Sequence, residues 1–141
     1  MAAKSKPFSI RIAPETEALI VAEAKRTHRS KGAVVEALAE EALRTRIFPG
    51  IAFRGDDFDR RAWVIGTAFD VWQIIDAYRD VGSIEAMVAE GNLSERQSRL
   101  ALAYYERFPD EIDAAIAQNQ RPLAQLRAEH PFIEVYSPAE K

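Results

Sequence analysis

The side chains best suited to binding chemistry lie near the N-terminus, where apolar and polar residues alternate. In an extended strand over residues 8–12, Ser9 and Arg11 share one face. The opposite face is apolar and carries Phe8, Ile10 and Ile12. In the DNA major groove, arginine forms paired hydrogen bonds with guanine, and serine contacts base edges less selectively. The pattern therefore predicts a strand whose polar face contacts DNA.

That strand has no partner within its own part of the chain. Pro14 follows almost at once and begins a helical pattern, so no hairpin can form there. A single short strand leaves its backbone N–H and C=O groups unpaired and is not stable alone. We therefore expect a second copy of the chain to pair with it antiparallel across a two-fold axis, in a homodimer or a higher oligomer.

Two helices are predicted to follow the strand. Pro14 suits the first turn of a helix that runs to about Thr27, and Ser30 is a favourable N-cap for a second helix over residues 31–45. Apolar residues recur at helical spacing in both helices, and neither helix can bury that face within so small a unit. The helices thus also favour a dimer.

This arrangement resembles the ribbon-helix-helix family of repressors and antitoxins. Residues 8–15 and 29–35 carry the resemblance, which covers residues 6–46. It implies a dimeric β-ribbon whose DNA-binding residues are Lys6, Pro7, Ser9 and Arg11. It also implies that free N–H groups at the start of the second helix hold a DNA phosphate. These groups belong to Ser30, Lys31 and Gly32. His28 stands where the family often has glycine, and histidine tolerates the positive φ that the turn needs.

Composition and charge narrow the function further. The chain has 141 residues and no cysteine, so disulfides and thiolate metal sites are excluded and a cytoplasmic location is expected. No signal peptide or membrane span is apparent. Residues 1–46 hold nine Lys and Arg against six Glu, whereas residues 47–141 hold ten Lys and Arg against sixteen Asp and Glu. A basic arm on an acidic body indicates that nucleic acid meets the arm and another partner meets the body.

Residues 47–120 predict a second unit, a small β-hairpin followed by helices. The expected elements are strands over residues 51–54 and 62–65 and helices over residues 69–81, 83–90, 94–108 and from Pro109 onward. Ser83 and Ser94 are favourable caps and Gly91 a favourable turn residue, which together give helix-turn-helix organisation. The acidic run over residues 56–59 is interpreted as a solvated loop rather than a metal site, because EF-hand spacing is absent.

Residues 48–120 also resemble a helix-turn-helix-containing domain of bacterial antitoxins that pair with PIN-like toxins. The resemblance is carried by residues 49–51, 64–66, 93–97, 100–105 and 109–113. Many members have a Gly-Thr-Arg turn after the second strand, whereas here Ala68 replaces the arginine. Arg96, Gln97 and Arg99 lie where a recognition helix would touch DNA, but the acidic side chains of this unit oppose DNA approach. We therefore favour protein contacts for it.

Residues 121–141 form a C-terminal segment with a short predicted helix and then a strand over residues 132–136. The strand has apolar groups on both faces, supplied by Phe132, Ile133, Val135 and Tyr136. Two alternatives remain open: it packs on its own body, or it adds a strand to a partner. The antitoxin resemblance implies that these residues bind a toxin, with Arg121 or Arg127 reaching into the toxin's metal pocket.

No enzyme is expected. His28 and His130 are the only histidines, and the sequence contains no catalytic triad order, P-loop or His-Glu metal motif. No cofactor is expected either, because the resemblance assigns the metal to the toxin.

The predicted fold is mainly α with short β: a dimeric N-terminal ribbon-helix-helix over residues 1–46, a β-hairpin and helix-turn-helix-like domain over 47–120, and a tail over 121–141. The predicted function is that of a VapB-like type II antitoxin that represses its own operator and neutralises a PIN-domain ribonuclease. The alternatives are a stand-alone regulator whose acidic domain senses a ligand or oligomerises, and a protein-interaction module that never meets DNA.

Overall fold

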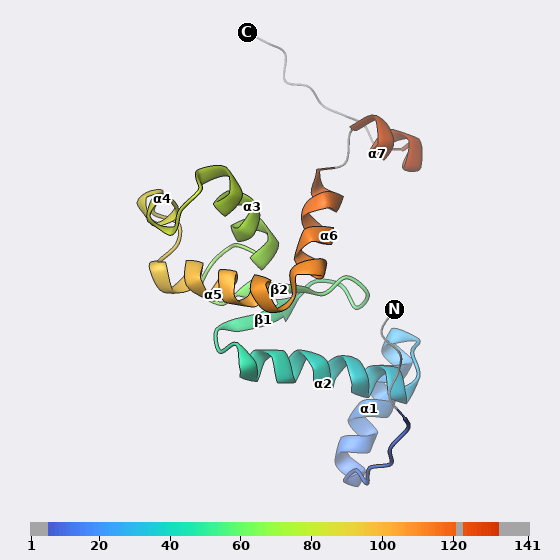
Figure 1. Cartoon of the computed structure of the whole chain (residues 1–141). Helices are drawn as coiled ribbons and strands as arrows, with labels where there is room; N and C mark the ends of the chain where they lie inside the picture. The colour runs from blue at the N-terminus through green and yellow to red at the C-terminus, as the bar shows by residue number, and fades with distance from the viewer. Residues whose placement is uncertain (1–5, 121–122, 133–141) are drawn as a thin grey trace.

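The computed structural model describes residues 6–120 and 123–132 (Figure 1). The chain forms helices α1 (Pro14–Thr27) and α2 (Lys31–Ile47), then strands β1 (Ile51–Arg54) and β2 (Arg61–Val64). Helices α3 (Val71–Val81), α4 (Ile84–Ala89), α5 (Glu95–Arg107), α6 (Pro109–Asn119) and α7 (Leu123–Glu129) follow. The hairpin lies between the two N-terminal helices on one side and α3, α5 and α6 on the other (Figure 1).

The predicted N-terminal β-ribbon is wrong. Residues 6–12 form neither helix nor strand, and the two-stranded sheet found among the described residues is the β1–β2 hairpin, which follows two helices. A strand needs a neighbour that accepts and donates its backbone hydrogen bonds. No described segment of this chain supplies one to residues 6–12. Phe8 and Ile10 are consequently 82% and 58% exposed instead of lying on a buried face.

Both N-terminal helices are confirmed, and local signals explain where they begin. Pro14 occupies the first turn of α1, and His28 ends it in the left-handed conformation, with φ of 53°. The Ser30 hydroxyl accepts a hydrogen bond from the Ala33 N–H at 3.1 Å and thereby caps α2. Helix α2 runs to Ile47, two residues beyond its predicted end.

The hairpin and the helices after it are confirmed with small shifts. Strand β2 begins one residue earlier than predicted, so Ile51 pairs with Val64 and Ile65 lies outside the sheet, half exposed. The hydroxyls of Ser83 and Ser94 cap α4 and α5, as their positions predict. Gly91 makes the turn between these helices with a φ of 83°.

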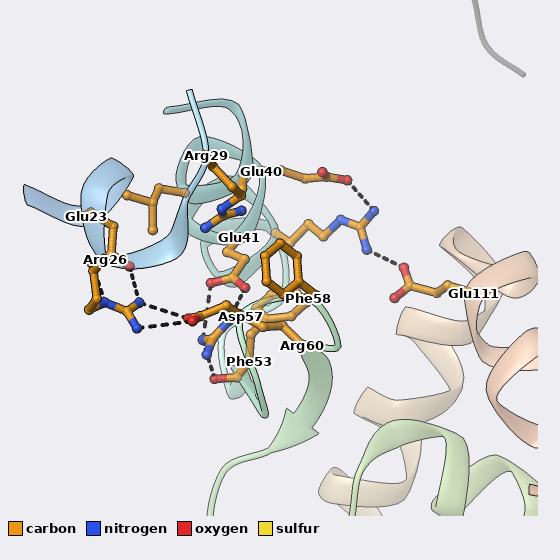
Figure 2. Close-up of a pocket in the computed structure, with 13 residues that line it drawn as sticks. Glu23, Arg26, Arg29, Glu40, Glu41, Phe53, Asp57, Phe58, Arg60 and Glu111 are labelled. Atoms are coloured by element: carbon orange, nitrogen blue, oxygen red, sulfur yellow. Dashed lines mark hydrogen bonds and ion pairs between the residues drawn. The ribbon is translucent and has the colours of Figure 1, made fainter. Parts of the chain in front are cut away.

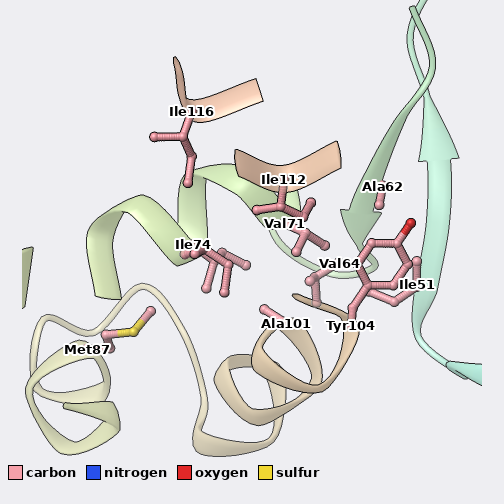
Figure 3. Packing of buried hydrophobic residues seen from close by; sticks show 11 residues of the cluster. Ile51, Ala62, Val64, Val71, Ile74, Met87, Ala101, Tyr104, Ile112 and Ile116 are labelled. Atoms are coloured by element: carbon pink, nitrogen blue, oxygen red, sulfur yellow. The ribbon is translucent and has the colours of Figure 1, made fainter. Parts of the chain in front are cut away.

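One hydrophobic core holds this second unit together (Figure 3). Its eleven buried residues are Ile51, Ala62, Val64, Val71, Ile74, Ile75, Met87, Ala101, Tyr104, Ile112 and Ile116. They come from the hairpin and from α3 to α6, so we call residues 48–120 the body and residues 6–47 the N-terminal unit. Within the described ranges, no helix is both long and apolar enough to cross a membrane.

Candidate nucleic-acid interface and the seam behind it

The N-terminal unit buries very little of itself. Ala24, Thr27 and Val34 are its three buried residues within the described chain. By contrast, Leu19, Leu43 and Ile47 are 72%, 59% and 60% exposed. Where exposed apolar side chains form one large patch, that patch commonly marks a contact with another molecule.

Four cations gather around the turn that joins α1 to α2. They are Lys25, Arg26, Arg29 and Lys31, and no acidic residue lies between the first and the last of them. We call them the turn cluster. His28 ends α1 in the left-handed conformation, and within the cluster Arg26 and Arg29 line the same cleft, whereas Lys25 does not.

The cations of the turn cluster differ in how far carboxylates neutralise them. Lys25 and Arg29 form no ion pair with any residue that the structure describes, although the Arg29 Nε donates to the Thr27 hydroxyl at 3.2 Å. Lys31 lies 3.6 Å from Glu17, and both side chains are more than half exposed, so solvent screens that pair. Arg26 is the exception, because Glu23 and Asp57 both bind it.

The start of α2 keeps the features expected of an anion-binding helix end. Ser30 caps the helix, and the first N–H groups of any helix lack acceptors within it. Gly32 has open space around it, since an added Cβ would meet only the Ser30 hydroxyl, at 4.0 Å. Glycine costs a helix about 1 kcal/mol relative to alanine. Among the described residues, leaving aside the chain neighbours of Gly32 and the helix's own backbone, no atom other than that hydroxyl lies within 4 Å of the place a Cβ would take.

The other predicted DNA-binding residues all lie on the surface. Lys6, Pro7, Ser9 and Arg11 are exposed, and neither Lys6 nor Arg11 forms an ion pair with a described residue. The structure does not place them on a strand, and it shows no contact that joins them to the turn cluster. They therefore share the unit with the turn cluster but not one preformed site.

The start of α5 offers little to DNA. Gln97 is engaged in the capping box, where its side-chain oxygen accepts from the Ser94 N–H at 2.9 Å. Arg99 pairs with Glu95 at 2.8 Å, so Arg96 is the remaining exposed cation of this stretch. Of the two arginines near the start of α5, one is thus paired with a carboxylate of a described residue and one is not.

The structure describes only some of the predicted toxin-binding residues. Phe132 is 81% exposed in a turn, and Arg127 belongs to α7. Arg121, Ile133, Val135 and Tyr136 lie outside the described residues, as does most of the predicted strand over residues 132–136.

No sequence pattern predicts the seam, the set of ion pairs that joins the N-terminal unit to the body. A cleft of about 520 Å³ lies there, between α1, α2, the hairpin loop and α6 (Figure 2). Ion pairs cross it at three places: Arg26 with Asp57, Glu41 with Arg60, and Arg44 with Glu111. These partners are separated in sequence by 31, 19 and 67 residues, so no local pattern could reveal them.

The third bridge of the seam is anchored in the core. The hydroxyl of Tyr104, a fully buried residue, accepts from Arg44 at 2.8 Å and donates to Glu111 at 3.2 Å. Burial, together with the nearby Glu111 carboxylate, raises the pKa of Tyr104 well above its usual range, although Arg44 opposes this. The phenol therefore stays neutral and keeps donating at physiological pH.

The acidic hairpin loop is also more organised than a solvated loop. Asp57 and Asp59 are paired with Arg26 and Arg61, and the hydrogen bond from Arg26 lowers the pKa of Asp57. In the part of the chain that the structure describes, no three His, Cys, Asp or Glu residues come together as a metal site.

No family model, curated protein or solved structure matches this chain. The antitoxin resemblance of residues 48–120 therefore remains a hypothesis.

Proposed function

We propose that this chain is a dimeric DNA-binding repressor that also serves as the antitoxin of a toxin–antitoxin pair. One observation carries the DNA-binding half of the proposal. The N-terminal unit, in which Lys6, Arg11, Lys25 and Arg29 form no ion pair with a described residue, is also the unit that leaves large apolar side chains exposed. A second copy would cover those side chains, and DNA would neutralise the cations.

A second copy is the simplest cover for the apolar faces. Burying one leucine or isoleucine side chain stabilises an interface by about 1.5–3 kcal/mol, so the exposed Leu19, Leu43 and Ile47 offer a substantial driving force. A two-fold dimer closes on itself, because each copy presents the same surface to the other. The helices, rather than a β-ribbon, would form this interface, with Phe8 and Ile10 adding to it.

DNA is the polyanion that best suits the cations. Residues 1–46 carry a net charge of +3, which a dimer doubles, while the rest of the chain carries −6. Lys6, Lys25 and Arg29 would neutralise phosphates without regard to sequence. The capped start of α2 would hold one further phosphate through backbone N–H groups. Arg11 would read a base edge.

Titration of fluorescent DNA from upstream of the chain's own gene tests this half. Arg11→Ala should weaken binding to that DNA by about 1–3 kcal/mol while changing binding to scrambled DNA far less. Lys25→Ala should weaken both and reduce the slope of log K against log salt by about 0.9 for each chain. Arg96→Ala, on α5, is the control and should change neither. A wild-type chain that binds neither DNA at low salt would overturn the proposal.

The antitoxin half rests on different support. Residues 48–120 resemble antitoxin domains, and the acidic body is poorly suited to DNA but well suited to a protein partner. We assign that partner as a PIN-like ribonuclease encoded by the adjacent reading frame. Co-purification with that neighbour is expected, and deleting residues 122–141 should weaken toxin inhibition while sparing DNA binding. If the product of the adjacent reading frame is soluble and never associates with this chain, the antitoxin half of the proposal is refuted and the DNA-binding half is not.

The seam favours one alternative, a stand-alone regulator that senses a ligand. Its cleft of about 520 Å³ falls within the usual size of small-molecule sites, about 300–1,000 Å³. Ion pairs cross that cleft at three places, which makes it a less suitable pocket than its volume indicates. A DNA affinity that responds to a small metabolite but to no protein neighbour would favour this alternative.

A further inference from the structure

We infer that the hairpin loop restrains DNA binding by occupying one cation of the turn cluster as a phosphate would. The restraint is the contact between Asp57 on the loop and Arg26 at the end of α1. The inference deepens the proposed function and rests on it, since it assigns a built-in competitor to the same surface that is proposed to bind DNA.

The geometry of the contact is that of arginine with a bidentate anion. Arg26 donates from Nη2 to Asp57 Oδ1 at 2.8 Å and from Nη1 to Oδ2 at 3.1 Å (Figure 2). Two parallel N–H···O bonds are the arrangement in which a guanidinium holds either a carboxylate or a phosphate. Asp57 therefore occupies the face of Arg26 that a DNA phosphate would use.

The loop is positioned against the cluster rather than against one residue alone. Phe58, next to Asp57, lies under the guanidinium of Arg29, with its ring centre 5.9 Å from the Arg29 carbon. Arg29 contributes electrostatically to the lowered pKa of Asp57, after the larger effects of Arg26. The loop therefore touches two of the four cations, Arg26 through Asp57 and Arg29 through Phe58.

The contact between Arg26 and Asp57 is exposed enough for a DNA phosphate to compete with it, and it contributes little to the stability of the fold. The side chains of Arg26 and Asp57 are 57% and 35% exposed, and solvent screens ion pairs of such exposure, so they contribute little to stability. Two other bridges cross the same seam, through Arg60 and Arg44. Losing Asp57 would leave the N-terminal unit attached, and a phosphate could displace it at little cost. Glu23 would still hold Arg26 from within α1, so the release of Arg26 would be partial.

Two variants of equal net charge test the inference. Asp57→Asn removes the competing carboxylate with almost no change of shape. Asp56→Asn removes an exposed carboxylate of the same loop that pairs with no described residue. DNA titrations of the full chain at several salt concentrations should show Asp57→Asn binding several-fold more tightly, with a salt slope steeper by up to about 0.9 for each chain. Asp56→Asn should show only a small gain from net charge, with no change of slope.

A third variant distinguishes release of Arg26 from any indirect effect. In an Arg26→Gln chain, Asp57→Asn should bring no more gain than Asp56→Asn, because there is no arginine left to release. Equal affinities for Asp57→Asn and Asp56→Asn, in a protein that binds DNA, would overturn the inference and leave the proposed function standing. Persistence of the extra gain in the Arg26→Gln background would also overturn it. A wild-type chain that binds no DNA would refute the proposed function instead.

Discussion

The body and the N-terminal unit differ in how many of their apolar side chains they bury. The body gathers eleven side chains into one core, and most of its arginines pair with carboxylates, as Arg54 does with Asp70 and Arg79 with Asp113. The N-terminal unit buries three residues and leaves large apolar side chains and several cations in solvent. The difference indicates that the body supplies its own core, whereas the N-terminal unit does not, which is why we propose that a second copy completes it.

The largest expected effect is on the free energy of unfolding, when an isoleucine in the core of the body is replaced and compared with an isoleucine on its surface. Ile74 is 1% exposed, so Ile74→Ala should leave a cavity in the core and lower the free energy of unfolding by about 2–5 kcal/mol. Ile65→Ala, at a half-exposed position just beyond β2, should cost about 1 kcal/mol or less. Urea denaturation measures both. Equal costs would mean that the core of the body is not the one described.

A smaller effect is expected where the two regions are joined. Tyr104→Phe removes the buried hydroxyl that links Arg44 to Glu111 and should cost about 1–2 kcal/mol. Tyr105→Phe is the matched control, since its hydroxyl bonds Arg79 and Asp113 on the exposed surface. That change should cost clearly less in the same denaturation experiment. If Tyr105→Phe were the more harmful change, the buried bridge would not be what couples the regions.

The smallest effect concerns pH. The hydrogen bonds from Arg26 lower the pKa of both Asp57 and Glu23 below their ordinary values. A carboxyl whose pKa is lower in the folded chain than in the unfolded chain stabilises the fold at neutral pH and stops doing so as the pH falls through the folded pKa. The contact should therefore persist at neutral pH and fail only below about pH 4.

An NMR titration of the Asp57 carboxyl, in the wild type and in Arg26→Gln, checks this pH dependence. The variant should return the pKa of Asp57 towards the ordinary aspartate value. An unchanged midpoint would show that Arg26 does not hold this carboxyl in solution.

Local signals made much of the fold predictable. Pro14 and the hydroxyls of Ser30, Ser83 and Ser94 start helices through contacts within three residues, so the sequence alone locates those starts. The alternation in residues 8–12 wrongly predicted a strand, because a strand depends on more than local signals. Alternation specifies which side chains share a face of a strand, but it does not supply the hydrogen-bonding neighbour that makes a strand.

The candidate site was predictable only where it is contiguous. The predicted N-cap Ser30 is confirmed, whereas the phosphate site at Ser30, Lys31 and Gly32 stays a prediction. The seam was not predictable, because Arg26 and Asp57 meet only after the hairpin has packed against α1. Single charged residues far apart in sequence carry no sign of which opposite charge they will meet.

The central claim is that the N-terminal unit is completed by a second copy, and the mass of the chain in solution tests it most directly. Sedimentation equilibrium over a range of concentrations should give twice the chain mass of 15.8 kDa. Leu19→Asp, which places a charge on the exposed face of α1, should shift the protein to the single-chain mass without altering the unfolding of the body. Val88→Asp, a comparable change at an exposed position on α4 of the body, should leave the dimer intact. A wild-type chain of 15.8 kDa at every concentration would contradict the account.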